Sequence, residues 1–459
     1  MSGAGSPSQP GAWLRTRPGR LALALLAIEF LAGVQSFMQA AVAPEIAAEF
    51  HAERSLGLIH SAALASSFLG LPWGPKILQR LGTARTVLWA TVLSAAGALV
   101  SAAAPDVPVF LLGRCLAGLS AGVLATASMS AVVQHLPDGW RRAVFAGFSA
   151  VFLVSSLAGP AYAAAVAQHL HWRWAMVLYL PLLLAARAVV ARNLGAPAPD
   201  RDAPGPGPGV ALALPVSALA ICLGPELPSV WGAASALAGA AALFVCAVRL
   251  LPRGVFRARR GRRCAVRVFF VLTGLYVAAE AVIPISARAV LHASLGELGA
   301  VLAAGGLAWA IVGVACARRP ALRRGRYRRR ARLGGACLLA GFALLAGTVL
   351  WRPPGAVLAL GLGWTLASIG MGLMYLDTVN LVVTEPEGGD GMDEAETVRA
   401  LAYSEQLSAL LLATPFATLA GLLVSGGVGR WIGLPLGGLA AFAGVLLLWV
   451  PAAAAALRE

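Results

Sequence analysis

Apolar segments of about 18 residues or more recur from one end of this chain to the other. A helix rises about 1.5 Å per residue, so each segment is long enough to cross the roughly 30 Å hydrocarbon core of a bilayer. The composition agrees, because 59% of the residues are hydrophobic and only 12% are charged. Soluble globular proteins average about 25% charged residues. The sequence therefore predicts an all-α integral membrane protein.

The apolar segments fall into groups of six, two and six. The expected spans are 20–43, 55–78, 84–104, 107–134, 143–168 and 173–194, then 210–227 and 229–250, then 267–291, 297–317, 333–351, 355–383, 400–425 and 431–456. This division predicts a cytoplasmic tail, a six-helix bundle, a Pro/Gly linker, an extra transmembrane hairpin, a basic loop and a second six-helix bundle, at 1–19, 20–194, 195–209, 210–250, 251–266 and 267–456. Two six-helix halves are typical of transporters that bind substrate between repeats. We therefore expect 14 transmembrane helices in this order.

The net charge of +16 is carried almost wholly by arginine, with Lys76 as the single lysine. If the N-terminus is cytoplasmic, every arginine-rich gap, including Arg318 to Arg332, falls on the cytoplasmic side, as the positive-inside rule requires. We therefore expect a multi-pass protein of the cell membrane with both termini in the cytoplasm. The arginines lack the interleaved aromatic residues that stack on bases, so we expect no nucleic-acid partner. The expected partners are the lipid bilayer, protons and a small-molecule substrate, and we expect a monomer.

The chain lacks the motifs of nucleotide and metal chemistry. None of the six cysteines forms a C-x-x-C pair, and no Walker A loop is present, so we expect neither a metal, nor a cofactor, nor an ATP-driven pump. The enzyme-class alternative is a membrane-embedded transferase. Its only support is His135 and Asp138 near an inner helix end, so we expect a protein that is not an enzyme.

Ionisable side chains inside a span are costly unless they are paired or face a wet cavity. We expect Glu29, Glu280, Asp377 and His60 to be candidates for proton coupling, because a buried carboxyl or imidazole group can exchange protons near neutral pH. The alternative for each is a structural group satisfied by hydrogen bonds. Arg187 and Arg288 lie nearer to helix ends, where we expect their side chains to snorkel to the interface.

Polar and aromatic side chains also interrupt the Ala-, Leu- and Val-rich spans. The candidates for lining a substrate cavity are Gln35, Gln39, Arg114, Tyr162, Tyr276, Tyr375, Asn380 and Gln406. Arg114 could instead brace the first span through Gln35, Gln39 or backbone carbonyls. Few charges and many small residues suit a roomy, mostly apolar cavity for a lipophilic or amphipathic compound.

Four short motifs mark the first half of the chain. They are Arg80-Leu81-Gly82 after the second span, Arg114 with Gly118 and Gly122 in the fourth, Ser155-x-x-x-Gly159-Pro160 in the fifth, and Trp172-Arg173-Trp174 before the sixth. Small residues four apart allow two helices to approach to backbone contact, and Pro within a helix produces a bend. The interval between the last two motifs is the most specific feature of the set.

These motifs resemble the major facilitator superfamily, and within it the fourteen-span drug:proton antiporters. The resemblance implies alternating-access efflux driven by protons, with Arg80, Gly82, Ser155, Gly159 and Pro160 in the conformational motifs. The chain departs from that pattern at Gln35, which occupies the position of an acidic residue in the first span. An uptake symporter or a facilitator on the same fold therefore stays open as the alternative.

Overall fold

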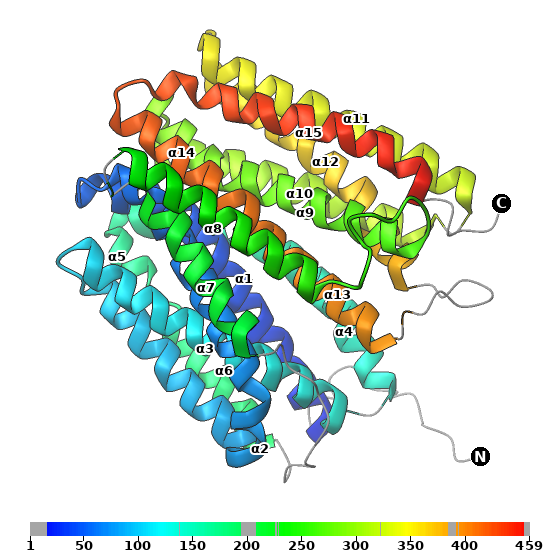
Figure 1. The fold of residues 1–459 in the computed structure, drawn as a ribbon. Helices are drawn as coiled ribbons and strands as arrows, with labels where there is room; N and C mark the ends of the chain where they lie inside the picture. The colour runs from blue at the N-terminus through cyan, green and yellow to red at the C-terminus, as the bar shows by residue number, and fades with distance from the viewer. Residues whose placement is uncertain are drawn as a thin grey trace.

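The computed structural model describes residues 16–136, 138–193, 208–224, 227, 229–321, 323–383, 392 and 394–453. Within these ranges the secondary structure is helical and includes no strand (Figure 1). The all-helical prediction is therefore confirmed for the part of the chain that the structure describes. The predicted linker lies almost wholly outside these ranges.

The first half of the chain forms helices α1 to α6. Their bounds are α1 (Arg17–Glu49), α2 (Leu56–Ala102), α3 (Val107–His135), α4 (Asp138–His169), α5 (Trp172–Ala175) and α6 (Leu180–Asn193). Helix α2 contains both the second and the third predicted spans. They are separated by a turn at Gly82, where the backbone is not helical. Gly82 has φ 76° and ψ 162°, a conformation that glycine adopts far more readily than other residues. The Arg80-Leu81-Gly82 motif thus ends on the residue that permits this turn.

A two-helix hairpin and a second set of helices follow. Their bounds are α7 (Pro208–Leu223), α8 (Ser229–Leu250), α9 (Arg262–Ile285), α10 (Leu295–Arg318), α11 (Arg324–Trp351), α12 (Ala356–Val383), α13 (Glu394–Ser408), α14 (Thr414–Ser425) and α15 (Gly433–Ala453). A π-helical turn at Ser286–Val290 extends α9, and another at Ala409–Ala413 joins α13 to α14. Within the described residues, 11 helices are long and apolar enough to cross a membrane, and Leu212–Ile221 is a shorter apolar helix. The count of 14 spans stays a prediction.

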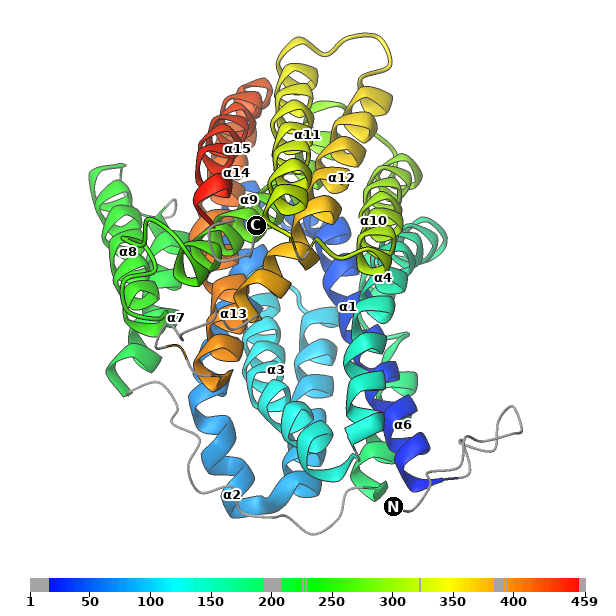
Figure 2. The ribbon, with the colours of Figure 1, turned by 90° about the vertical axis from the view of Figure 1, so that its right-hand side faces the viewer.

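The two halves of the chain repeat one packing scheme. In the first half, α1 packs against α4 and α6; in the second, α9 packs against α13 and α15. The contacts across the halves are reciprocal, because α4 packs against α10 while α2 packs against α14. Figure 2 shows the second half above the first, with α7 and α8 at one side. This arrangement is that of two inverted or parallel repeats facing each other across a shared interface.

The hairpin of α7 and α8 is held together by close backbone approach. A Cβ atom added at Gly232 would lie 2.3 Å from the carbonyl oxygen of Gly224, and the Ser235 hydroxyl donates to the carbonyl of Ala220 at 2.8 Å. Helix α7 packs against α2 and α14, and α8 packs against α13. The hairpin therefore lies beside the line where the two halves meet, and whether it spans the membrane stays a prediction.

The start of α1 and the end of α15 lie at the same end of the molecule, which we call the terminal end (Figure 1). We call the opposite end, with the loops around His51, Ala103 and His292, the far end. Contacts between the halves gather toward the far end. Arg288 forms an ion pair with Glu45, and a Cβ atom at Gly421 would lie 2.3 Å from the Glu53 carbonyl oxygen. The halves are therefore joined at the far end.

Candidate functional site

A small pocket lies between the two halves, near the middle of the helices. Its lining residues are Phe37 of α1, Tyr276 and Glu280 of α9, Leu302, Gly306 and Trp309 of α10, and Trp364 of α12. The space inside is about that of one water molecule. As it stands, the pocket is too small for a drug-sized molecule.

The wall of the pocket is a packed aromatic cluster. The Tyr276 ring stacks on Trp364 with centroids 4.6 Å apart, and the Trp309 ring centroid lies 5.3 Å from that of Tyr276. The Tyr276 hydroxyl is 3.1 Å from the Ser368 hydroxyl. Helix α10 accommodates Trp364 because Gly305 has no side chain; a Cβ atom there would lie 2.2 Å from the indole nitrogen. The indole N–H of Trp364 has no acceptor among the described residues.

Glu280 is the charged group of this pocket. The residue is half-buried, and it lines the small pocket described above. Among the described residues it has neither a hydrogen bond nor an ion pair, and its electrostatic neighbour is Tyr276. An intramembrane carboxyl group without a cation is costly and marks a functional position. The role of Glu280 in proton coupling stays a prediction.

Two more carboxyl groups lie between the halves. Glu29 on α1 and Glu405 on α13 are close enough for their charges to interact, and Glu405 also acts on Tyr375. Both side chains are exposed, and they come from opposite halves of the chain. Sequence reasoning missed Glu405, although a carboxyl group inside the predicted span 400–425 was the signal that could have identified it. Two carboxyl groups, one from each half, therefore lie near each other between the halves.

Asp377, by contrast, is embedded in a structural network. Its side chain is 2% exposed and accepts a hydrogen bond from the Ala321 amide at 3.0 Å, and it forms an ion pair with Arg330 at 2.9 Å. Arg330 also donates to the carbonyl of Arg319. Asp377 thereby ties α12 to the turn between α10 and α11. These contacts favour the structural alternative over proton coupling.

Arg114 is buried in α3 with 6% of its surface exposed. It interacts electrostatically with Tyr179, which also interacts with Arg187. The expectation that Arg187 snorkels is wrong, because Arg187 is 8% exposed and donates to the Thr91 hydroxyl at 3.4 Å. The two arginines and Tyr179 instead form a buried cluster inside the first half. The bracing of α1 by Arg114 stays a prediction.

The other predicted lining residues are spread over several positions. Tyr162 donates to the Ala175 carbonyl at 2.9 Å, which gives it a structural contact near the far end. The Tyr375 ring packs on Phe269 and Trp309 and so joins the aromatic cluster to Glu405. The carbonyl oxygen of the Gln406 side chain is buried without a donor among the described residues. Gln35, Gln39 and Asn380 are half-buried, and the side chain of His60 lies outside the described part.

The Ser155 and Gly159 frame brings α4 into backbone contact with α1. The Ser155 hydroxyl donates to the Phe30 carbonyl at 2.9 Å, and its side chain fills the space that a Cβ atom at Gly33 would need. A Cβ atom at Gly159 would lie 2.5 Å from the Phe37 Cβ. The close approach expected from the small-residue spacing is therefore present, and the partner helix is α1.

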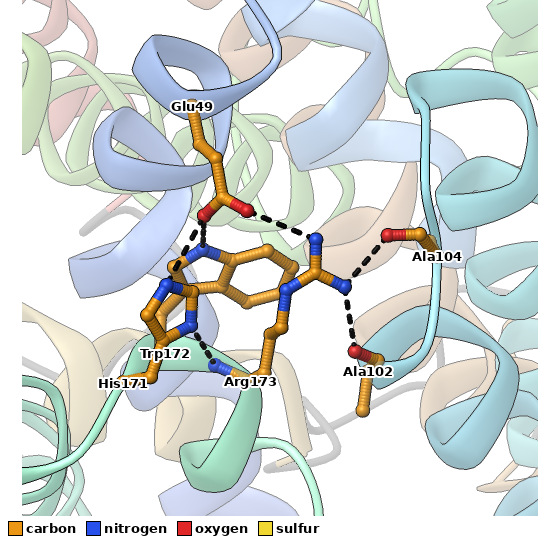
Figure 3. A network of polar contacts seen from close by, with 6 residues as sticks. All are labelled: Glu49, Ala102, Ala104, His171, Trp172 and Arg173. Atoms are coloured by element: carbon orange, nitrogen blue, oxygen red, sulfur yellow. Dashed lines mark hydrogen bonds and ion pairs between the residues drawn. The ribbon is translucent and has the colours of Figure 1, made fainter.

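Two residues of the Trp172-Arg173-Trp174 motif, Trp172 and Arg173, belong to a polar network at the far end (Figure 3). Glu49 accepts hydrogen bonds from the Trp172 indole and, at 2.9 Å, from the Arg173 guanidinium, which also donates to the carbonyls of Ala102 and Ala104. Burial raises the pKa of the Glu49 carboxyl, but these hydrogen bonds and the charge of Arg173 outweigh burial and hold the pKa below its usual value. The motif thus fastens the end of α1 to the α2–α3 turn and α5.

Arg288 lies near the end of the helix that begins with α9, as expected. It forms an ion pair with Glu45 of the first half and donates to the Ala293 carbonyl. Both charged side chains are about one quarter exposed. This is a salt bridge between the halves at the far end, and its partner could not be read from the sequence.

The family model of the Major Facilitator Superfamily matches residues 25–387. The chain belongs to this superfamily. A major facilitator protein is a multi-pass membrane protein that transports small molecules, and the expected family is therefore confirmed.

Two relatives and one solved structure illustrate the likeness. The chain is 28% identical to the efflux pump hmp6 of Hypomyces subiculosus over 156 residues, and 27% identical to the probable multidrug-efflux transporter Rv1634 of Mycobacterium tuberculosis over 164 residues. These matches span 33% and 35% of this chain, but only 27% and 35% of those proteins. The structure of the human organic anion transporter MFSD10 (TETRAN) superposes with a TM-score of 0.62 at 17% identity, covering 96% of this chain and 100% of that one. That likeness is one of fold.

Proposed function

We propose that this transporter exports a small lipophilic or amphipathic compound, a drug or a secondary metabolite, in exchange for protons. The observation that carries the proposal is the set of three carboxyl groups between the halves: Glu29, Glu280 and Glu405. Among the described residues none of them forms an ion pair. Each charged carboxylate is costly in such surroundings, and protonation removes that cost. Proton binding can therefore bias the movement of the two halves.

The contacts between the halves and the expected topology indicate the conformational state. The contacts described above join the halves at the far end, and we infer from them that the halves open toward the terminal end, beside Glu29 and Glu405. The arginine-rich loops, including Arg318 to Arg332, also belong to the terminal end, so the positive-inside rule makes it cytoplasmic. We therefore interpret the structure as an inward-facing state in a cell membrane, ready to receive substrate from the cytoplasm.

The relatives support efflux over uptake. Both curated relatives cited above are named as efflux proteins. The aromatic wall around Tyr276, Trp309 and Trp364 supplies apolar contact surface of the kind that lipophilic compounds need. The uptake symporter remains the alternative function, because it would use the same carboxyl groups with protons and substrate moving together.

Inside-out membrane vesicles that contain the chain separate these functions. We expect acidification of the vesicle interior to drive accumulation of fluorescent lipophilic dyes, and a protonophore to abolish it. Vesicles with Glu280→Gln should insert the same amount of protein and show no pH-driven accumulation. Dye leaving the acidified vesicles would indicate symport, and dye movement without any response to pH would indicate a facilitator.

Labelling of single cysteines tests the topology on which the direction depends. A cysteine at Arg326 should react only with reagent on the cytoplasmic side, and a cysteine at Ala103 only with reagent outside. Glu226, in the loop of the predicted hairpin, lies outside the described residues and should also be labelled from outside. Labelling of Glu226→Cys only from the cytoplasm would rule out the 14-span arrangement.

A further inference from the structure

The Glu280 pocket is built almost wholly by the second half of the chain. Of its seven lining residues, six come from α9, α10 and α12, and only Phe37 comes from the first half. Phe37 therefore differs from the other six: when the halves move relative to each other, it is the lining residue that moves with the opposite half.

The second-half wall is rigid within itself. Tyr276 and Trp364 are 3% and 2% exposed, they stack on each other, and the Tyr276 hydroxyl is bound to Ser368. Close-packed aromatic side chains keep their arrangement when a domain moves as a body. We therefore expect the part of the pocket around Glu280 to move as one unit.

Phe37 is held just as firmly by the first half. Its Cβ occupies the space left by the missing side chain of Gly159, and Met38, the next residue, is fully buried. The Ser155 hydroxyl fixes the preceding part of α1 through the Phe30 carbonyl. The frame of small residues on α4 thus sets the position of Phe37.

We propose that Phe37 is the lid of the Glu280 pocket, a positioning residue that controls when water and protons reach Glu280. While the halves are joined at the far end, the phenyl ring completes the wall and leaves space for about one water molecule. When the halves separate there, Phe37 withdraws with α1 and α4, and a proton from water can bind a carboxylate oxygen of Glu280. Access to Glu280 then depends on which end is open. The consequence for transport rests on the proposed proton coupling, but the lid itself does not.

Thiol labelling measures access without relying on transport. Glu280→Cys, with the six natural cysteines replaced, is treated with a small charged methanethiosulfonate reagent in proteoliposomes. We expect Phe37→Ala to raise the labelling rate at position 280 severalfold, because removal of the phenyl ring opens one wall of the pocket. Phe30→Ala is the matched control, because Phe30 lies two turns away on the same face of α1 but does not line the pocket. Phe37→Leu should give a smaller rise and replaces Phe37→Ala if that variant does not fold.

Equal labelling rates in the Phe37→Ala and Phe30→Ala backgrounds would overturn the lid. A second measurement keeps its failure separate from that of the proposed function: proton leak and pH-driven dye transport in Phe37→Ala with Glu280 intact. We expect more leak and less transport per proton. If labelling rises but neither Phe37→Ala nor Glu280→Gln changes pH-driven transport, the lid stands and the proton-coupling role of Glu280 fails.

Discussion

Replacing Gly159 with alanine should destabilise the first half and displace α1. A Cβ atom at this position would lie 2.5 Å from the Phe37 Cβ, 3.1 Å from the Val34 carbonyl oxygen and 3.4 Å from the Met38 amide nitrogen. An ordinary Cβ contact begins at 3.4 Å, so the first contact is too short by 0.9 Å. The nearest atom is itself a Cβ and cannot rotate away, so the backbone of α1 has to move. Overpacking of this kind typically costs about 1–3 kcal/mol.

Gly313→Ala is the matched control for that variant. Gly313 lies in α10 and has no heavy atom within 4 Å of an added Cβ, so alanine there should stabilise the helix by up to about 1 kcal/mol. Thermal unfolding of both purified proteins in the same detergent gives the comparison. We expect a lower Tm for Gly159→Ala and an unchanged or higher Tm for Gly313→Ala. Equal Tm values would refute the close approach of α4 and α1 as an energetic constraint. The larger Gly159→Leu should insert and bind ligand but lose net transport.

Two further predictions concern the far end. Removing the ion pair between Arg288 and Glu45, by Arg288→Gln or Glu45→Gln, should weaken closure of the far end by about 1 kcal/mol or less. Spin labels at the far end should then show a longer average distance. A double variant no different from either single variant would confirm that the two residues act as a pair, and unchanged distances would contradict a role of this ion pair in closure. The pKa of Glu49 lies below its ordinary value of 4.5, so its contribution to stability is fully present above pH 4.5 and is lost as the pH falls through the lower pKa of the folded state. Acid should therefore lower the Tm of the wild type more than that of Glu49→Gln, and parallel pH profiles would argue against this network.

The helices were readable from the sequence because hydrophobic length alone determines which segments can span a bilayer. Spacing was also informative: the turn at Gly82 and the close approach of a helix at Ser155 and Gly159 follow from residues that lie close together in the chain, although the partner, α1, was not predicted. Local patterns of this kind can be interpreted without knowing the distant partners, so they can be predicted from the sequence.

The roles of the charged residues were harder to predict because their partners are distant in the sequence. Asp377 forms an ion pair with Arg330 and accepts a hydrogen bond from the Ala321 amide, and Arg288 forms an ion pair with Glu45. Periodicity within one helix does not show such pairs. Phe37 carried no signal at all, since phenylalanine is ordinary in an apolar span, and only the packing shows that it faces Glu280.

The most direct test of proton-coupled alternating access is the effect of pH on distances across the two ends of the molecule. Spin labels at Arg80 and Arg326 report on the terminal end, and labels at Ala103 and Trp351 report on the far end. We expect two distance populations at each end in the wild type, changing in opposite directions between pH 8 and pH 6, and no such pH response in Glu280→Gln. A single population at both ends, or a pH response that is the same in Glu280→Gln, would contradict the coupling of Glu280 to the movement of the halves.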